Sequence, residues 1–177
     1  MSVFGWIVIH QNLGGEFNWK LPWANYREGF GSHSSTFFLG LENIHRLTYY
    51  QSYRLRVEML ADSYLWYSAE YRHFHLDNEV NKYRLNVAGY TGDAGNLLDD
   101  DNDDDDVSYT HDGMMFSTVD SDNDIDLDGS CPDDKNGGWW FNTCYKVCLM
   151  CNNPRHRCYT LDEVQLLVSR MMIKPIM

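Results

Sequence analysis

The sequence predicts a single α+β domain in which an antiparallel sheet is accompanied by a few short helices and long loops. Three observations support this prediction. Several segments alternate apolar and polar residues with a period of two, as half-buried strands do. Two short segments have the spacing and flanking residues of helices. Long stretches rich in glycine or aspartate separate these elements.

The elements follow in chain order. Residues 3–9 contain a β-rich run and are predicted to form a buried strand, which ends before a turn at Gly14 and Gly15. Proline opens and Gly29 closes a predicted helix over 22–28, and apolar spacing near three predicts another over 41–47. The remaining predicted strands are 53–59, 66–76, 83–87 and 164–173.

Charge and hydropathy exclude several classes of protein. The formal net charge of −12 argues against binding to nucleic acid or to an anionic membrane surface, both of which require basic counter-charge. No segment approaches the ~20 apolar residues that a membrane-spanning helix needs. The first ten residues lack the basic lead and small-residue cleavage site of a secretory signal. No Ser/His/Asp or Cys/His arrangement is supported, so we expect no enzyme.

Two segments interrupt the strand pattern. Residues 99–106 are nearly pure aspartate and are predicted to form a solvated loop, because such a block cannot join a core. All five cysteines lie between Cys131 and Cys158, and the odd number leaves at least one without an internal partner.

A series of aspartates at alternate positions from 120 to 128 precedes Gly129 and Cys131. Carboxylates at this density repel one another unless a cation lies among them, and hard oxygen donors suit Ca²⁺. An EF-hand is one alternative, but its twelfth position, counted from Asp124, would be Lys135 and not the required glutamate. A solvated acidic turn without metal is the other alternative.

The chain resembles the fibrinogen C-terminal domain family, which includes fibrinogen chains, ficolins, tachylectins, angiopoietins and tenascins. The matching strings occur in family order. They are GWIVI (5–9), YREGFG (26–31), FLG (38–40), IHRLT (44–48), YRLRV (53–57), AEY (69–71), KYRLNV (82–87), GYTGDAG (89–95), HDGMMFST (111–118), the aspartate loop, GWWFNTC (138–144) and MMIKP (171–175).

The resemblance also has departures. Family domains normally begin some tens of residues earlier with a small disulfide-bonded subdomain, and they run further after Cys144. We therefore expect one partial domain over 1–177. Its expected parts are a sheet region (1–98), an acidic inserted loop (99–106), a calcium and pocket subdomain (107–163) and a closing strand (164–177).

For the metal site, the resemblance implies Ca²⁺ bound by the side chains of Asp122 and Asp124. It also implies backbone carbonyls, from Asp126 or Leu127 and from Asp128 or Gly129. Asp120 is expected to hold the loop rather than to bind the ion.

The resemblance also implies a disulfide between Cys131 and Cys144, worth about 3 kcal/mol in the chain-entropy model. The alternative is a pair of reduced thiols in a chain that is never exported. In lectin members a pocket for acetylated sugars lies beside this disulfide, with a cis peptide bond into the second cysteine. The corresponding residues here are Trp140, Asn142, Thr143, Cys144 and Tyr145.

Two features make this pocket depart from the family pattern. Tyr145 stands where family members commonly have histidine, and the downstream segment is shortened. Of Trp139 and Trp140, we expect at least one to belong to the core.

The tract with Cys148, Cys151, His156 and Cys158 suggests a zinc knuckle, although one residue between His156 and Cys158 is tight for that motif. A second disulfide with one spare thiol fits equally, and a frame error or divergent exon would also produce such a tract.

The resemblance implies a secreted, calcium-dependent module that binds glycans or acetylated groups, as innate-immune lectins do. The alternative is a protein–protein adhesion or signalling module of the same fold, which Tyr145 and the shortened segment favour. A diverged fragment without activity is a third hypothesis. Oligomers would form through segments not present here, since no coiled-coil heptads occur.

Overall fold

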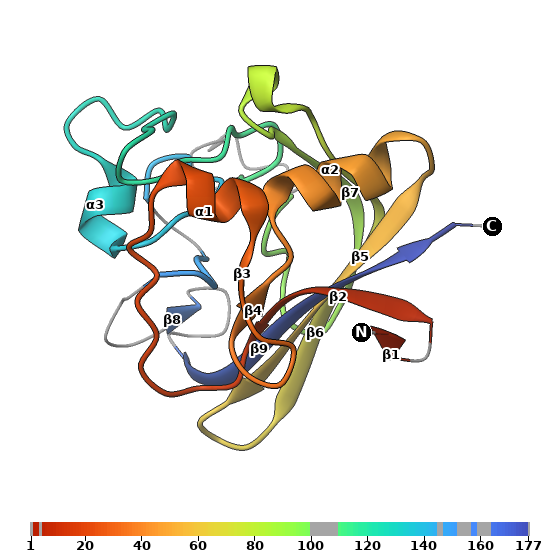
Figure 1. Cartoon of the computed structure of the whole chain (residues 1–177). Coiled ribbons are helices and arrows are strands. Elements are labelled where there is room, and N and C mark those ends of the chain that lie inside the picture. Colours follow the sequence, from red (N-terminus) through yellow and green to blue (C-terminus); the bar gives the residue numbers. More distant parts are fainter. Residues whose placement is uncertain are drawn as a thin grey trace.

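The structure is a computed structural model that describes residues 2–3, 5–99, 110–144, 147–151, 157–158 and 164–176. Its centre is a mixed-length antiparallel sheet with the strand order β3-β4-β2-β9-β5-β6-β7 (Figure 1). The strands are β1 (Ser2–Val3), β2 (Trp6–Asn12), β3 (Phe30–Gly31), β4 (Phe37–Phe38), β5 (Tyr53–Ala61), β6 (Trp66–Leu76), β7 (Leu85–Gly92), β8 (Arg157–Cys158) and β9 (Val164–Pro175). The helices are α1 (Trp23–Glu28), α2 (Leu41–Tyr49) and α3 (Cys131–Lys135), with a 3₁₀ turn at Glu79–Asn81.

The predicted α+β class is confirmed, and most predicted elements occur where the sequence placed them. The strand over 66–76 and the helix opened by Pro22 and closed by Gly29 are present as predicted. The helix starting at Leu41 continues two residues beyond the predicted end, to Tyr49. The last strand extends to Pro175.

Two predicted strands were wrong in their limits. Residues 3–9 do not form one strand, because the chain turns at Gly5, with φ of 81°, and β1 folds back antiparallel onto β2. The strand predicted over 83–87 begins only at Leu85, because Tyr83 has a φ of 46° and lies in a turn. Of the predicted solvated loop over 99–106, Asp99 is buried and the other residues lie outside the described part.

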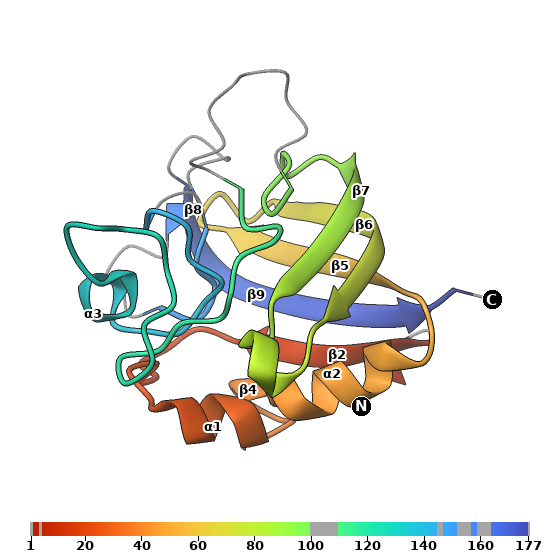
Figure 2. The same ribbon diagram turned by 90° about the horizontal axis from the view of Figure 1, so that it is seen from above.

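Strand β9 lies in the middle of the sheet, between β2 and β5 (Figure 2). Ile173 is paired with Ile7 on one side and with Leu55 on the other. Residues from both ends of the sequence therefore form the centre of the sheet, and all the pairings of the strands follow the antiparallel pattern.

The two faces of the sheet differ. Along β5, residues at odd positions from Tyr53 to Ala61 are buried, whereas those at even positions are exposed or half-buried. The buried face packs against α2 through Leu41 and Ile44, and the Thr48 hydroxyl accepts a hydrogen bond from the Leu76 N–H. Helices α1 and α2 lie together on this side of the sheet (Figure 1).

Close backbone packing fixes the position of the short strands β3 and β4. Gly31 has a φ of 83°, and a Cβ atom there would lie 2.1 Å from the carbonyl oxygen of Thr36. Only glycine allows this approach without displacement of the backbone. The loop-rich part of the chain with α3 lies at the end of the molecule opposite the two chain termini (Figures 1 and 2).

Candidate metal-binding loop

Side-chain hydrogen bonds anchor the start of the aspartate loop to the body of the domain. The Asp120 carboxylate oxygen Oδ1 accepts hydrogen bonds from the backbone N–H of Trp23 and from the Thr118 hydroxyl, each at 2.7 Å. Asn123 donates from its side chain to the carbonyl oxygen of Phe116 at 2.8 Å. The expectation that Asp120 holds the loop is confirmed by its contact with the start of α1.

The next part of the loop is a series of Asx turns, in which each aspartate accepts a hydrogen bond from the amide two residues later. The N–H of Asp124 donates to Asp122 at 3.2 Å, that of Asp126 to Asp124 at 2.9 Å, and that of Asp128 to Asp126 at 3.2 Å. These turns hold successive carboxylates close together although the chain contains no regular secondary structure here.

Asp124 is the electrostatic centre of this loop. Burial, together with a side-chain contact with Asp122, raises the pKa of its carboxyl group to about 6. Hydrogen bonds from the N–H groups of Cys131 and Asp126 act in the opposite direction. Two carboxyl groups in contact are stable together only when a proton or a cation lowers their repulsion.

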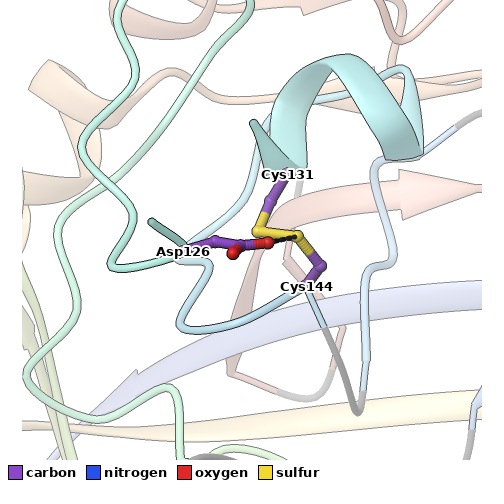
Figure 3. A group of neighbouring side chains, drawn as sticks. All are labelled: Asp126, Cys131 and Cys144. Carbon is purple, nitrogen blue, oxygen red and sulfur yellow. Dashed lines mark hydrogen bonds between the residues drawn. A yellow bond between two sulfur atoms is a disulfide. The ribbon is translucent and has the colours of Figure 1, made fainter. Parts of the chain in front are cut away.

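The predicted disulfide between Cys131 and Cys144 is present, with Cα atoms 5.0 Å apart. Cys131 opens α3, and Cys144 follows the buried tryptophan segment, so the bond joins the end of the acidic loop to that segment. Figure 3 shows the Asp126 carboxylate pointing at this bond, with Oδ2 3.4 Å from the Cys144 sulfur. Asp126 and the two sulfurs are close enough to hold a metal, but sulfurs bonded to each other offer no thiolate.

The carboxylates fit Ca²⁺ better than the sulfur-containing group does. Asp122, Asp124 and Asp126 supply hard oxygen donors in a short, anchored segment. A Cβ placed on Gly129 would lie 3.8 Å from an Asp126 oxygen and 4.0 Å from an Asp134 oxygen, so both carboxylates lie near Gly129. Asp134 was not predicted, because only the formation of α3 brings it near Gly129.

Asp128 and Gly129 are exposed at the tip of the loop, and so are Ile125 and Leu127, at 52% and 98% exposure. The assignment of particular side chains and carbonyls as calcium ligands stays a prediction.

The residues predicted to line a ligand pocket are only partly accessible. Trp140 is fully buried, and its indole N–H donates to the carbonyl oxygen of Tyr83 at 2.9 Å. Asn142 is 3% exposed and donates to the carbonyl oxygen of Thr110. Both side chains therefore belong to the core of the structure, and their assignment to a ligand pocket stays a prediction. Trp139 is fully buried as well, so the expectation that at least one of the two tryptophans is a core residue is confirmed.

Thr143 and Cys144 are half-buried beside the loop, and Tyr145 lies outside the described residues. The expected cis peptide bond into Cys144 is not found, and no cis bond occurs among the described residues. Cys144 instead adopts a φ of 66°, in the left-handed region that a residue with a Cβ rarely occupies.

Cys148 and Cys151 form a second disulfide, which agrees with one of the alternatives for the cysteine-rich tract. Their sulfurs are therefore not zinc ligands, and the zinc knuckle was wrong for this pair. His156 lies outside the described residues, as does the side chain of Cys158.

Comparison with protein families identifies the fold. The family model of the fibrinogen beta and gamma chains, C-terminal globular domain, matches residues 2–164. The chain belongs to the fibrinogen C-terminal domain family. Lamprey (Petromyzon marinus) fibrinogen gamma chain is 42% identical over 150 residues, covering 80% of this chain and 34% of the relative. Human angiopoietin-related protein 7 is 44% identical over 141 residues, covering 79% of this chain and 37% of the relative.

Solved structures agree with this assignment. The fibrinogen-like globe domain of human ANGPTL6 superimposes with a TM-score of 0.84 at 29% identity, covering 97% of this chain and 78% of that one. The lamprey fibrin D-dimer complexed with the peptide Gly-His-Arg-Pro-amide gives 0.82 at 33% identity, covering 96% and 61%. The chain thus spans about a third of the length of the curated relatives it matches.

None of the described helices of this fibrinogen-like domain is long and apolar enough to cross a membrane. The domain division and the absence of an enzymatic site stay predictions.

Proposed function

We propose that this fibrinogen-like domain is an extracellular recognition module in which bound Ca²⁺ fixes the loop that contacts a protein or peptide partner. The contact between the Asp122 and Asp124 carboxyl groups, in a loop anchored by Asp120 at one end and by a disulfide at the other, is the observation that carries this proposal. The sequence of the loop creates a local repulsion that a divalent cation would neutralise.

Bound calcium would supply positive charge and oxygen coordination among these carboxylates. Asp122, Asp124 and Asp126 would hold the ion, with Asp134 as a further oxygen donor near Gly129. Backbone carbonyls between Asp126 and Gly129 would complete the set that the resemblance implies. The loop presents these oxygen atoms in a conformation that is fixed by the Asx turns and by the hydrogen bond from the Cys131 N–H to Asp124.

The exposed side chains of the loop support a protein or peptide as the partner. Ile125 and Leu127 alternate with the carboxylates and project into solvent. Exposed apolar side chains with a polar rim are typical of protein interaction sites. The lamprey fibrin relative has been solved with a peptide, which supports the same class of ligand. The burial of Trp140 and Asn142 leaves these two side chains little surface for contact with a sugar, which also favours a protein or peptide.

Extracellular location is supported by the chemistry of the cysteines. Two disulfides occur among the described residues, and disulfides persist mainly in oxidising compartments. Both bonds join segments within the loop-rich part of the domain, where the sheet does not supply rigidity.

Calcium titration by calorimetry, followed by a capture assay with and without a chelator, tests the proposal. The probes are the Gly-His-Arg-Pro-amide peptide and an array of acetylated glycans. We expect the wild type to take up Ca²⁺ and to capture the peptide only when calcium is present. Chelator-sensitive capture of acetylated sugars instead would support the lectin-like function. Absence of calcium uptake at millimolar concentration would overturn the role of the loop.

A matched variant pair sharpens this test. Asp122→Asn with Asp124→Asn should abolish calcium uptake, whereas Asp62→Asn removes an exposed carboxylate from the turn between β5 and β6 and should leave it unchanged.

A further inference from the structure

The face of the sheet that points away from α1 and α2 has a charge opposite to that of the chain as a whole. Directly paired residues of adjacent strands point to the same side. The outward residues of β9, β5 and β6 are Val168, Arg170, Met172 and Lys174; Arg54, Arg56, Glu58 and Leu60; and Trp66, Ser68, Glu70 and Arg72. This basic sheet face carries five cationic and two anionic side chains, a formal charge of +3, whereas the whole chain carries −12.

Two glutamates hold three of the arginines in place. Glu58 pairs with Arg56 at 2.8 Å and accepts a hydrogen bond from Arg170 Nε at 3.0 Å. Glu70 pairs with Arg54 at 3.1 Å and with Arg56 at 3.4 Å. A guanidinium has five N–H donors, so each arginine keeps donors that these carboxylates do not use. The arginine side chains remain 29–45% exposed, and their orientation is fixed in advance of binding.

Arg72 and Lys174 have no carboxylate partner among the residues that the structure describes. Arg72 lies with its aliphatic stem across Gly89 of β7, where a Cβ would be 3.1 Å from the Arg72 Cβ and 3.4 Å from its Cγ and Cδ. The Lys174 ammonium is 5.9 Å from the centre of the Trp6 ring. Burial of the stem and a cation–π contact restrict these side chains while their charge stays available.

The cations also form a row. Lys174 is paired with Arg54 across β9 and β5, and Arg72 is two residues beyond Glu70 on the same side of β6. Neighbouring strands are ~4.8 Å apart, so three cations follow one another over roughly 10 Å. Trp66, which is 51% exposed, lies at the other end of this face, with the Arg170 guanidinium 5.9 Å from its ring centre.

We propose that the basic sheet face binds a sulfated polysaccharide. Guanidinium groups bind the oxygens of tetrahedral and planar anions with paired hydrogen bonds, and a row of fixed cations matches repeated sulfates along an extended chain. The exposed indole of Trp66 and the apolar side chains around it suit the apolar faces of sugar rings. The disulfides indicate an oxidising compartment, where sulfated polysaccharides rather than nucleic acids are the abundant polyanions. This face is separate from the loop with α3 (Figure 2).

Binding of the full chain to heparin, compared with chemically desulfated heparin, tests this inference. In 0.1 M salt the wild type should bind heparin and lose at least about tenfold in affinity when the sulfates are removed. Arg72→Gln with Lys174→Gln should weaken heparin binding about tenfold. The slope of log affinity against log salt concentration should also become less steep, by about two. Glu70→Gln should strengthen binding about threefold, because it removes a negative charge from the face while the amide oxygen can still accept hydrogen bonds from Arg54 and Arg56.

The matched control is Lys20→Gln with Arg46→Gln, which removes two exposed cations outside this face. It should change the affinity by less than about twofold, and each variant should keep the melting temperature of the wild type. A chelator should leave heparin binding unchanged, which separates this surface from the calcium loop. No heparin binding by the wild type, equal loss in the control pair, or equally tight binding of single-stranded DNA with the same charge would each overturn the inference.

Discussion

The Asp124 carboxylate accepts a hydrogen bond of 2.9 Å from the backbone N–H of Cys131, seven residues later in the chain. This bond closes the acidic loop onto the first residue of α3 and onto the disulfide. Asp124 thus links the proposed metal site to the Cys131–Cys144 disulfide, while its other oxygen accepts a hydrogen bond from the Asp126 N–H.

Substitution of Asp124 by Asn should weaken calcium binding at least about 100-fold, because it removes a charged ligand while an amide oxygen can still accept hydrogen bonds. Isothermal titration calorimetry provides the measurement. Asp62→Asn should bind calcium as the wild type does. Equal affinities of Asp124→Asn and the wild type would rule out Asp124 as a ligand.

The two disulfides should contribute unequally to stability. Cys131 and Cys144 are 13 residues apart and Cys148 and Cys151 only three, so the chain-entropy model gives about 3 and about 2 kcal/mol. Urea denaturation of the two double-alanine variants measures these values. Loss of the first bond should also weaken calcium binding, whereas loss of the second should not, since only the first closes the acidic loop. Weaker calcium binding after loss of the Cys148–Cys151 bond, but not after loss of the Cys131–Cys144 bond, would contradict the link between Asp124 and the Cys131–Cys144 disulfide.

The hydroxyl of Tyr26 connects three parts of the core. It donates to the carbonyl oxygen of Trp19 at 2.8 Å and accepts from the Gly138 N–H at 3.0 Å. Tyr26→Phe should reduce the free energy of unfolding by about 1–3 kcal/mol, because the buried Gly138 N–H loses its acceptor. Tyr64→Phe, at a position 78% exposed, is the control and should change stability by less than about 0.5 kcal/mol. Urea denaturation compares the two variants.

His10 should make stability depend on pH in the acidic range. Complete burial lowers the pKa of its imidazole to about 3, whereas the unfolded chain has the ordinary value of 6.5. Below pH 6.5 the unfolded state therefore binds a proton that the folded state does not bind until about pH 3. The free energy of unfolding falls with decreasing pH in this window, by about 1.4 kcal/mol per unit well below pH 6.5.

Comparison of the wild type with His10→Gln isolates this contribution, because other titrating groups cancel in the difference. Denaturation at several pH values should show a constant difference above pH 7 and a steady loss of wild-type advantage from pH 6 to 4. A difference independent of pH over the whole range would show that His10 does not remain neutral in the folded state.

The sequence predicted the long elements because their patterns depend on the main sheet itself. Alternation along Tyr53–Ala61 and Trp66–Leu76 follows directly from one buried and one exposed face. The two-residue strands β3 and β4 have no such pattern, since they depend on the approach of Gly31 to Thr36. Helix α3 has only five residues and begins at a disulfide, so helical periodicity could not reveal it.

The sequence predicted which residues belong to the candidate site, but not which of their side chains are buried. Spacing and resemblance identified the aspartates and the bond between Cys131 and Cys144. Burial of Trp140 depends on packing against Phe116 and on the carbonyl of Tyr83, which are distant in sequence. The local sequence around Trp140 therefore cannot show that its indole is buried in the core. Asp134 was missed because its proximity to Gly129 arises only when α3 forms.

The central place of β9 has a consequence for biosynthesis. While the ribosome is still translating the chain, β2 and the β5–β6–β7 unit exist without the strand that joins them, so two unpaired edges are exposed at once. The nascent chain cannot complete its folding until the segment ending at Pro175 has left the exit tunnel. Folding must then close contacts between opposite ends of the polypeptide, a slow step during which these strand edges stay open to pairing with other chains.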